Sequence, residues 1–219
     1  MTPARPRTGA STPYTGTPAP DHRLASAFTR RPRGEGDTGL RIGLAGPYAP
    51  SGGPASRHAR LLFEGLNSAQ LSVQVVRVGQ PEGSPVDHEE IVFDLTAGLD
   101  AGEKKAAEIL NRTDIVIMEH EVTGADARDP EQNIRLLEWL CVPVVVVIGP
   151  LASTLSATHR TVLTELIRSA DVLVTVSESD RGRLHSQFGA SLRQVLVIDQ
   201  DATVARFQEL INALLRRRP

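Results

Sequence analysis

Residues 40–66, LRIGLAGPYAPSGGPASRHARLLFEGL, contain an apolar run, a loop rich in glycine and proline, and a helical pattern in direct succession. Pro54 suits the first position of the predicted helix, and Gly53 suits the residue before it. The first backbone N–H groups of a helix lack partners within it, and the helix dipole places partial positive charge there. This loop is therefore a candidate site for an anionic group such as a phosphate. A tight turn that binds no ligand explains the same glycines.

From residue 40 onward, apolar strands alternate with helical segments. Several strands are continuous aliphatic runs, as expected where helices cover both faces of a parallel sheet, and 144–148 is the clearest. The alternation predicts an α/β fold with a single Rossmann-like, doubly wound, mainly parallel sheet flanked by helices. The expected strands are 40–45, 73–78, 91–95, 114–118, 143–148, 172–176 and 195–198. The expected helices are 55–67, 102–111, 131–140, 158–169, 178–188 and 203–217.

The two ends of the chain differ from this central region. Residues 1–38 carry six arginines against three acidic residues, are rich in proline and threonine, and show no hydrophobic period, which predicts a disordered tail. Residues 39–202 form the predicted Rossmann-like domain. Residues 203–219 place Phe207, Leu210 and Ile211 on one side of a helical pattern, so we expect an amphipathic helix that packs on the domain.

Composition narrows the classes of function. The 24 basic and 26 acidic residues give a net charge of −2, so there is no electrostatic case for nucleic acid. No window approaches the ~18 apolar residues of a membrane span. The N-terminus also lacks the apolar segment of a secretory signal, so we expect a cytoplasmic protein. Cys141 is the sole cysteine, and its neighbours Trp139 and Leu140 predict a buried structural thiol rather than a metal ligand.

Ligands of open α/β sheets bind beyond the carboxyl ends of the strands, so the residues after each expected strand are the candidates. The loop 46–53 matches neither the dinucleotide fingerprint nor the P-loop, and we expect no cofactor. Glu119, His120 and Glu121 follow another strand, where alternation places His120 opposite the two glutamates. A histidine there can donate, accept or titrate near neutral pH. A solvated strand end and a weak metal site are the alternatives, and we expect no metal.

Ser177 and Glu178 follow the strand expected at 172–176. Ser177 fits the N-cap of the next helix, and Glu178 favours the positive end of its dipole, so helix capping alone explains both residues. Because this helix N-terminus faces the same crevice, both residues are also candidates for the wall of a cleft.

These segments together resemble the N-terminal domain of GT-B-fold glycosyltransferases of family 4, which include retaining mannosyl- and glucosyltransferases. The resemblance covers residues 40–199 and implies one half of a GT-B fold. Besides the opening loop it rests on DIVIMEHE (114–121), VPVVVVIG (142–149) and SADVLVTVSESDRGRLHSQFGASLRQVLVI (169–198). In the family, the glycine loop lies against the diphosphate and sugar of the donor, and the histidine of a His-Glu pair contacts the transferred sugar. The resemblance thus implies a catalytic pair, His120 and Glu121. It also implies a ligand-binding group in and after the loop: Ser51, Gly52, Gly53 and His58.

The sequence departs from the family pattern after two strands. Gly149 and Pro150 stand where family members usually have a histidine, and residues 199–201 replace a Pro-His-Gly motif. The second Rossmann-like domain, which carries the nucleotide site in the family, lies outside these 219 residues. Because GT-B catalysis takes place between the two domains, we expect that this chain alone does not transfer sugar efficiently.

Three functions fit these observations. The first is a glycosyltransferase-like subunit for nucleotide-sugar-dependent hexosyl transfer, which would bind a nucleotide sugar or an acceptor and be completed by a donor-domain chain or by a second copy. The second is a non-catalytic binding or regulatory module that retains the fold. The third is an unrelated α/β enzyme acting on a phosphorylated metabolite, which the absence of a nucleophile or metal motif disfavours.

Overall fold

The computed structural model describes residues 39–49, 53–68, 70–79, 89–95, 100–122, 131–199 and 203–216. The chain divides into units of residues 1–30 and 31–219, and every described residue belongs to the second. The strands are β1 (Leu40–Gly46), β2 (Leu71–Val78), β3 (Ile91–Leu95), β4 (Ile115–His120), β5 (Val144–Ile148), β6 (Val172–Thr175) and β7 (Val195–Val197). The helices are α2 (Pro54–Leu66), α3 (Asp100–Leu110), α4 (Gln132–Glu138), α5 (Ala157–Ser169), α6 (Glu178–Phe188) and α7 (Thr203–Arg216). Each element expected from the sequence is present, with its ends within two residues of the prediction.

The seven strands form one sheet in the order β3-β2-β1-β4-β5-β6-β7, and all six neighbouring pairs are parallel. This confirms the predicted doubly wound α/β fold. The strand order reverses between β1 and β4, so the carboxyl ends of these two strands form the switch point at which open α/β sheets bind ligands.

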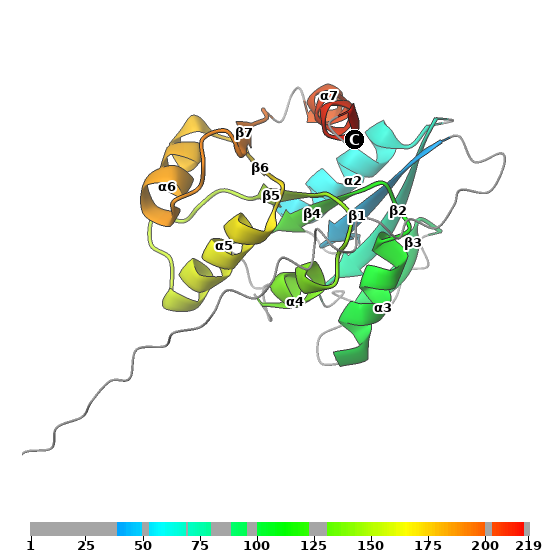
Figure 1. Cartoon of the computed structure of the whole chain (residues 1–219), viewed down its shortest axis with the longest axis horizontal. Coiled ribbons are helices and arrows are strands. Elements are labelled where there is room, and N and C mark those ends of the chain that lie inside the picture. The colour runs from blue at the N-terminus through cyan, green and yellow to red at the C-terminus, as the bar shows by residue number, and fades with distance from the viewer. Residues whose placement is uncertain are drawn as a thin grey trace, which may run out of the picture. The chain divides into compact units, whose positions relative to one another are not determined.

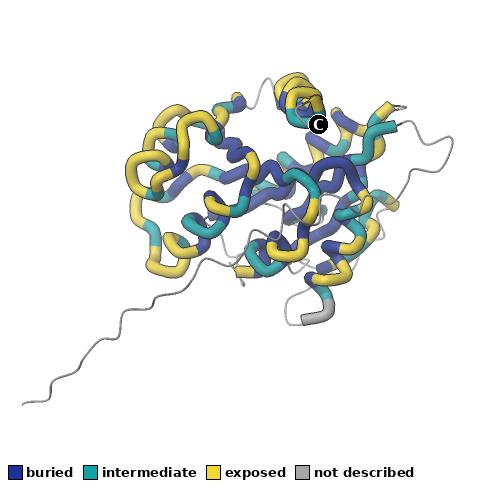
Figure 2. Tube along the Cα trace, viewed as in Figure 1, coloured by how far each residue is buried: buried dark blue, intermediate teal, exposed yellow. Residues whose placement is uncertain are grey.

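Helices cover both faces of the sheet. Helices α3, α4, α5 and α6 pack on one face of the sheet, and α2 and α7 pack on the other. In Figure 1, α3, α4 and α5 lie below the strands, α6 lies to the left, and α2 and α7 lie above. Along β5, Val144 and Val146 belong to the first hydrophobic core, and Val145 and Val147 belong to the second. Burial on both sides accounts for the unbroken aliphatic run of this strand (Figure 2).

Helix α7 lies beside α2 and contributes Phe207, Leu210 and Ile211 to the second core. The two helices approach closely at Gly65, where a Cβ atom would overlap the side chain of Val204. The apolar side of the amphipathic pattern is therefore the side that is buried.

Cys141 is exposed, so the prediction of a buried thiol is wrong. Helix α4 ends before this residue, and the side chain of Asn111 holds the turn that follows. Its amide nitrogen donates to the carbonyl oxygen of Trp139 at 2.8 Å, and its oxygen accepts from the N–H of Cys141 at 2.7 Å. These bonds keep the turn at the surface, where half of Trp139 is also accessible.

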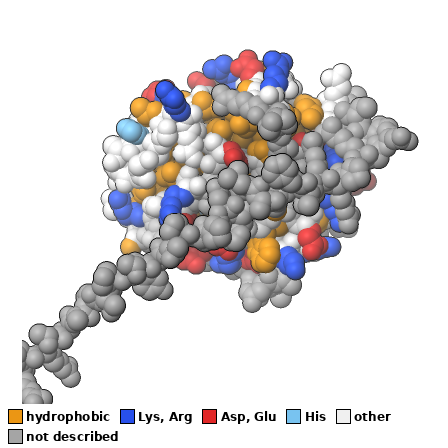
Figure 3. All heavy atoms as spheres, in the orientation of Figure 1, with side chains coloured by type: hydrophobic (Ala, Val, Ile, Leu, Met, Phe, Trp, Pro, Cys, Tyr) orange, Lys and Arg blue, Asp and Glu red, His pale blue; other side chains and the backbone are white. Residues whose placement is uncertain are grey.

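The described surface carries charges of both signs. Lys and Arg side chains lie among Asp and Glu side chains on the face seen in Figure 3, without gathering into a patch of one sign. Among the helices within the described ranges, none is long and apolar enough to cross a membrane.

Candidate functional site

Helix α2 begins at the switch point with an N-cap residue that has no side chain to cap the helix. Gly53 is the N-cap residue, with φ −72° and ψ 168°, and Pro54 occupies the first helical position as predicted. No acidic residue lies in the first turn. Neither the N-cap residue nor the first turn of α2 therefore supplies an oxygen or a carboxylate to the orphan N–H groups of this turn. Ser51 and Gly52, the other predicted loop residues, lie outside the described residues.

Glu119 and His58 form a buried pair on the α2 side of the sheet. The Nδ1 atom of His58 donates to Oε1 of Glu119 at 2.6 Å, and the side chains are 20% and 3% exposed respectively. Burial acts to lower the pKa of His58, but the hydrogen bond and the charge of Glu119 outweigh it and raise this pKa. Burial also raises the pKa of Glu119, against the opposing effect of His58. The ring of His58 lies 6.0 Å from that of Phe207, so the pair also borders α7.

Gly46 makes room for Glu119. Its φ is +151°, and a Cβ atom built there would lie 2.6 Å from Cβ of Glu119. Strand β1 can therefore approach the end of β4 only because residue 46 has no side chain.

His120, the next residue along β4, lies on the opposite side of the sheet. It is 4% exposed, and its Nδ1 atom lies 3.2 Å from the side-chain nitrogen of Asn133 in α4. Burial, and to a lesser degree the charge of His159, lower the pKa of His120 to about 4. Its Nε2 atom has no hydrogen-bond partner among the described residues. The predicted alternation between residues 119 and 120 is confirmed, and the alternative of a solvated strand end is wrong for both.

A buried arginine bonds Ala49, one of the residues that follow β1. Arg77, at the end of β2, is 2% exposed, pairs with Asp94 of β3 and donates to the carbonyl oxygen of Ala49 at 2.7 Å. This contact ties the described residues that follow β1 to the edge of the sheet.

The other predicted site residues take part in local structure. The Oγ atom of Ser177 accepts from the N–H of Asp180 at 3.0 Å, so the predicted N-cap of α6 is confirmed. Glu178 is exposed and pairs with Arg181 at 3.3 Å. Glu121 lies half-buried immediately after β4. Within the described ranges, no hydrogen bond or ion pair joins Ser177 or Glu178 to His58, Glu119 or His120.

The sequence does not identify Glu119 and Asn133 as the hydrogen-bond partners of the two histidines. The only signal for Glu119 was its place in the polar series after a strand. Asn133 had no signal, because its partner lies 13 residues away and is reached only through the packing of α4 on the sheet.

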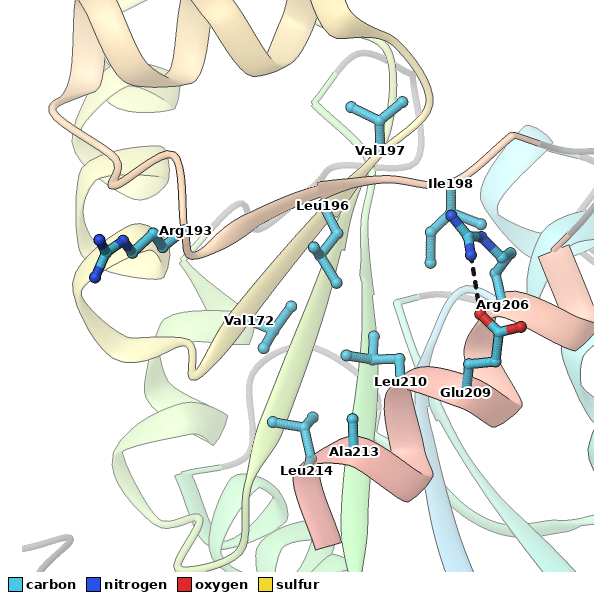
Figure 4. A pocket seen from close by; sticks show the side chains of 10 residues that line it. All are labelled: Val172, Arg193, Leu196, Val197, Ile198, Arg206, Glu209, Leu210, Ala213 and Leu214. Atoms are coloured by element: carbon cyan, nitrogen blue, oxygen red, sulfur yellow. Dashed lines mark hydrogen bonds and ion pairs between the residues drawn. The ribbon is translucent and has the colours of Figure 1, made fainter. Parts of the chain in front are cut away.

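A groove of about 310 Å³ lies elsewhere on the domain, between α7 and the strands β6 and β7 (Figure 4). Apolar side chains such as Val172, Leu196 and Leu210 line it, and Arg206, paired with Glu209, stands at its rim. None of the predicted site residues lines this groove. Among the described residues, no cluster of three His, Cys, Asp or Glu side chains is arranged to hold a metal ion.

One solved structure shares this architecture, and two further solved structures align with part of the chain. A sucrose-phosphate synthase from Thermosynechococcus elongatus aligns over 81% of this chain and 98% of its own, with a TM-score of 0.54 and 12% identity. An alpha-glucosyltransferase in complex with UDP and a 13-mer DNA containing an A:G mismatch aligns over 64% of this chain, with a TM-score of 0.48 and 21% identity. A second alpha-glucosyltransferase complex with UDP and DNA gives a TM-score of 0.44 and 18% identity. The aligned part of this chain spans 37% of each glucosyltransferase chain.

The fold is therefore the Rossmann-like α/β fold of GT-B glycosyltransferase domains. No protein-family model matches the chain, and no curated protein matches it. The sheet topology and the structural likeness establish the fold class, which does not by itself define a function.

Proposed function

We propose that the chain binds a nucleotide sugar at the carboxyl ends of β1 and β4, as the half of a family 4 glycosyltransferase that contacts the diphosphate and the sugar. The observation that carries this proposal is the buried Nε2 atom of His120 at the strand switch point, which has no hydrogen-bond partner among the described residues. Buried polar atoms are nearly always hydrogen-bonded, so an orphaned one at the ligand-binding edge of this fold favours a ligand. The uncapped start of α2 at the same edge suits a phosphate.

In this proposal the nucleotide is held mainly by a second domain from outside residues 1–219, supplied by a separate donor-domain chain or by a second copy. The cleft of a GT-B enzyme needs donors from both walls to stabilise the departing diphosphate. The non-catalytic binding module is the second candidate, and the sequence at the end of β5 favours it. Gly149 and Pro150 follow that strand, and neither has a side chain that can donate or accept a proton.

Calorimetric titration of the purified chain with UDP-glucose, GDP-mannose and the two free diphosphates tests the binding step. We expect weak binding of at least one of these compounds, and a Gly53→Val variant should lose about tenfold or more in affinity because the side chain blocks the approach of a phosphate to the backbone. Gly182→Val is the matched control, since residue 182 is exposed on α6 and a Cβ atom there meets nothing within 4 Å. If no compound binds, or if both variants bind like the natural chain, the proposed site is wrong.

Transfer from a radiolabelled nucleotide sugar separates the two candidates. We expect no turnover by the chain alone, whether or not it binds the compound. Turnover that appears on adding a donor domain and disappears in a His120→Leu variant would support the glycosyltransferase subunit. Binding without turnover under both conditions would support the module.

A further inference from the structure

We propose that Asn133 is the positioning residue of His120 and holds its imidazole as the tautomer that carries the proton on Nε2. His120 then presents a neutral hydrogen-bond donor, and the atom that docks against it is an acceptor, such as a hydroxyl or phosphate oxygen. The statement about the docking atom rests on the proposed function, whereas the statement about the tautomer does not.

The first step is the orientation of the Asn133 amide. Its nitrogen lies 3.2 Å from the main-chain oxygen of Glu119 and also 3.2 Å from Nδ1 of His120. A carbonyl oxygen only accepts hydrogen bonds, so the NH₂ group, and not the amide oxygen, must face Glu119. The carbonyl of β4 thereby fixes which end of the amide meets the histidine, an assignment that would otherwise remain open.

The second step follows from the chemistry of the imidazole ring. Because the amide nitrogen donates, Nδ1 of His120 accepts, and the single ring proton of a neutral histidine then resides on Nε2. The surroundings keep the ring neutral. His120 is 4% exposed, the carboxylate of Glu119 is bound to His58 on the opposite side of the sheet, and the Coulombic effect of His159 also disfavours a charged ring.

The third step concerns the polar atoms of this contact that remain without partners. Nε2 of His120 and Oδ1 of Asn133 are buried and have no hydrogen-bond partner among the described residues. Nε2 donates in the assigned tautomer, and Oδ1 accepts. A ligand with several hydroxyl groups complements such a set, because each hydroxyl both donates and accepts. A Nε2–H group cannot ligate a metal or remove a proton, so His120 acts as a donor rather than as a base.

The tautomer is measured directly by long-range proton–nitrogen NMR correlation of the histidine side chains at neutral pH. The chain has six histidines, and the signal missing from a His120→Gln variant assigns His120. We expect the natural chain to show a protonated Nε2 and an unprotonated Nδ1. A protonated Nδ1 in the natural chain would overturn the proposal.

The Asn133→Asp variant tests whether residue 133 sets the tautomer. A carboxylate at this position accepts from Nδ1, so the proton should move to Nδ1 or the ring should become doubly protonated. Asn111→Asp is the matched control, because Asn111 also bonds main-chain groups but lies at the turn near Trp139. An unchanged His120 signal in a folded Asn133→Asp protein overturns the proposal. If that variant does not fold, Asn133→Ala takes its place. The proposal is overturned if the Nδ1 chemical shift of His120 in the Asn133→Ala variant equals that of the natural chain, because alanine cannot donate a hydrogen bond to Nδ1.

Ligand titration followed through the same His120 signal separates this inference from the proposed function. UDP-glucose, glucose and inorganic phosphate are added in turn to the natural chain. A shift with glucose identifies a hydroxyl as the docking group, and a shift with phosphate identifies a phosphate oxygen. An Nε2–H tautomer that responds to none of them refutes the proposed function and the acceptor assignment, while the role of Asn133 in holding the tautomer stands.

Discussion

Two histidines lie on opposite sides of the end of strand β4 and meet opposite environments. His58 donates to the buried carboxylate of Glu119, and its pKa is raised. His120 accepts from the amide of Asn133, and burial lowers its pKa to about 4. Glu119, the partner of His58, and His120 are adjacent residues of one strand, so a single step of strand alternation separates a charged site from a neutral one.

The difference shows that burial alone does not decide the charge of a histidine. Both rings are largely buried, and burial by itself disfavours the charged form of each. A carboxylate partner reverses that preference for His58, whereas an amide partner leaves it in place for His120. One edge of the sheet thereby carries a basic group and a neutral donor on its two sides.

The largest effect is expected from Gly46→Val, because residue 46 lies against Glu119, the partner of His58. Strain at φ +151° and overlap with Cβ of Glu119 together should cost about 4 kcal/mol of unfolding free energy. Urea unfolding measures the loss. Gly79→Val is the control, because its φ is +101° but a Cβ atom there meets nothing within 4 Å, so about 2 kcal/mol of strain remains. Equal losses in both variants would mean that contact with Glu119 does not matter.

Acid should weaken the fold through His120. Its pKa of about 4 in the folded protein lies below the ordinary 6.5, so the folded state binds fewer protons than the unfolded chain. Its contribution to stability is complete above pH 6.5 and falls by about 3 kcal/mol as the pH drops to 4. Urea unfolding of the natural chain and of His120→Gln across this range measures the difference. A difference that does not change with pH would contradict the low pKa.

The His58–Glu119 pair should respond to pH in the opposite direction. Glu119→Gln removes the charge but keeps an acceptor for Nδ1, and we expect a loss of about 2 kcal/mol below pH 6.5. Because the folded pKa of His58 is raised, the advantage of the natural chain should shrink as the pH rises through that pKa. The raised pKa of Glu119 acts in the same direction. An advantage that grows with pH, measured by unfolding of both proteins, would contradict this assignment.

The smallest effect is expected from His159→Gln, which measures how much His159 contributes to the low pKa of His120. The charge of His159 is the lesser of the two causes that lower the pKa of His120, so its removal should raise that pKa slightly. An NMR titration of the His120 ring measures the change. His185→Gln is the control, because His185 bonds the carbonyl oxygen of Ala190 and has no part in the shift. A downward shift of the His120 pKa in His159→Gln would exclude the role of this charge.

The sequence predicts most of the fold because each element has a strong local pattern. The aliphatic run of β5 requires burial on both faces, and Gly53 with Pro54 fixes the start of α2. The turn at Cys141 was mispredicted because its position depends on Asn111, 30 residues away. Apolar neighbours in sequence indicate burial only where the segment continues into the core, and this one ends at the surface.

The sequence predicts only those features of the site that depend on the order of residues along one strand. Alternation along β4 correctly separates Glu119 from His120, but it does not identify what faces each of them. Those partners come from α2 and α4, and their approach depends on how the helices pack on the sheet. The protonation states follow from these partners, so they too are accessible only in three dimensions.

Arg77 has a consequence for how the domain opens. It joins β3 at the sheet edge, through Asp94, to the residues that follow β1, through Ala49. Release of β3 would remove the partner of a buried guanidinium and free Ala49 at the same time. Amide hydrogens of the edge strand and of Tyr48 and Ala49 should therefore exchange with solvent as one cooperative unit. These residues after β1 would then be as stable as the outermost strand of the sheet, and no more stable than that.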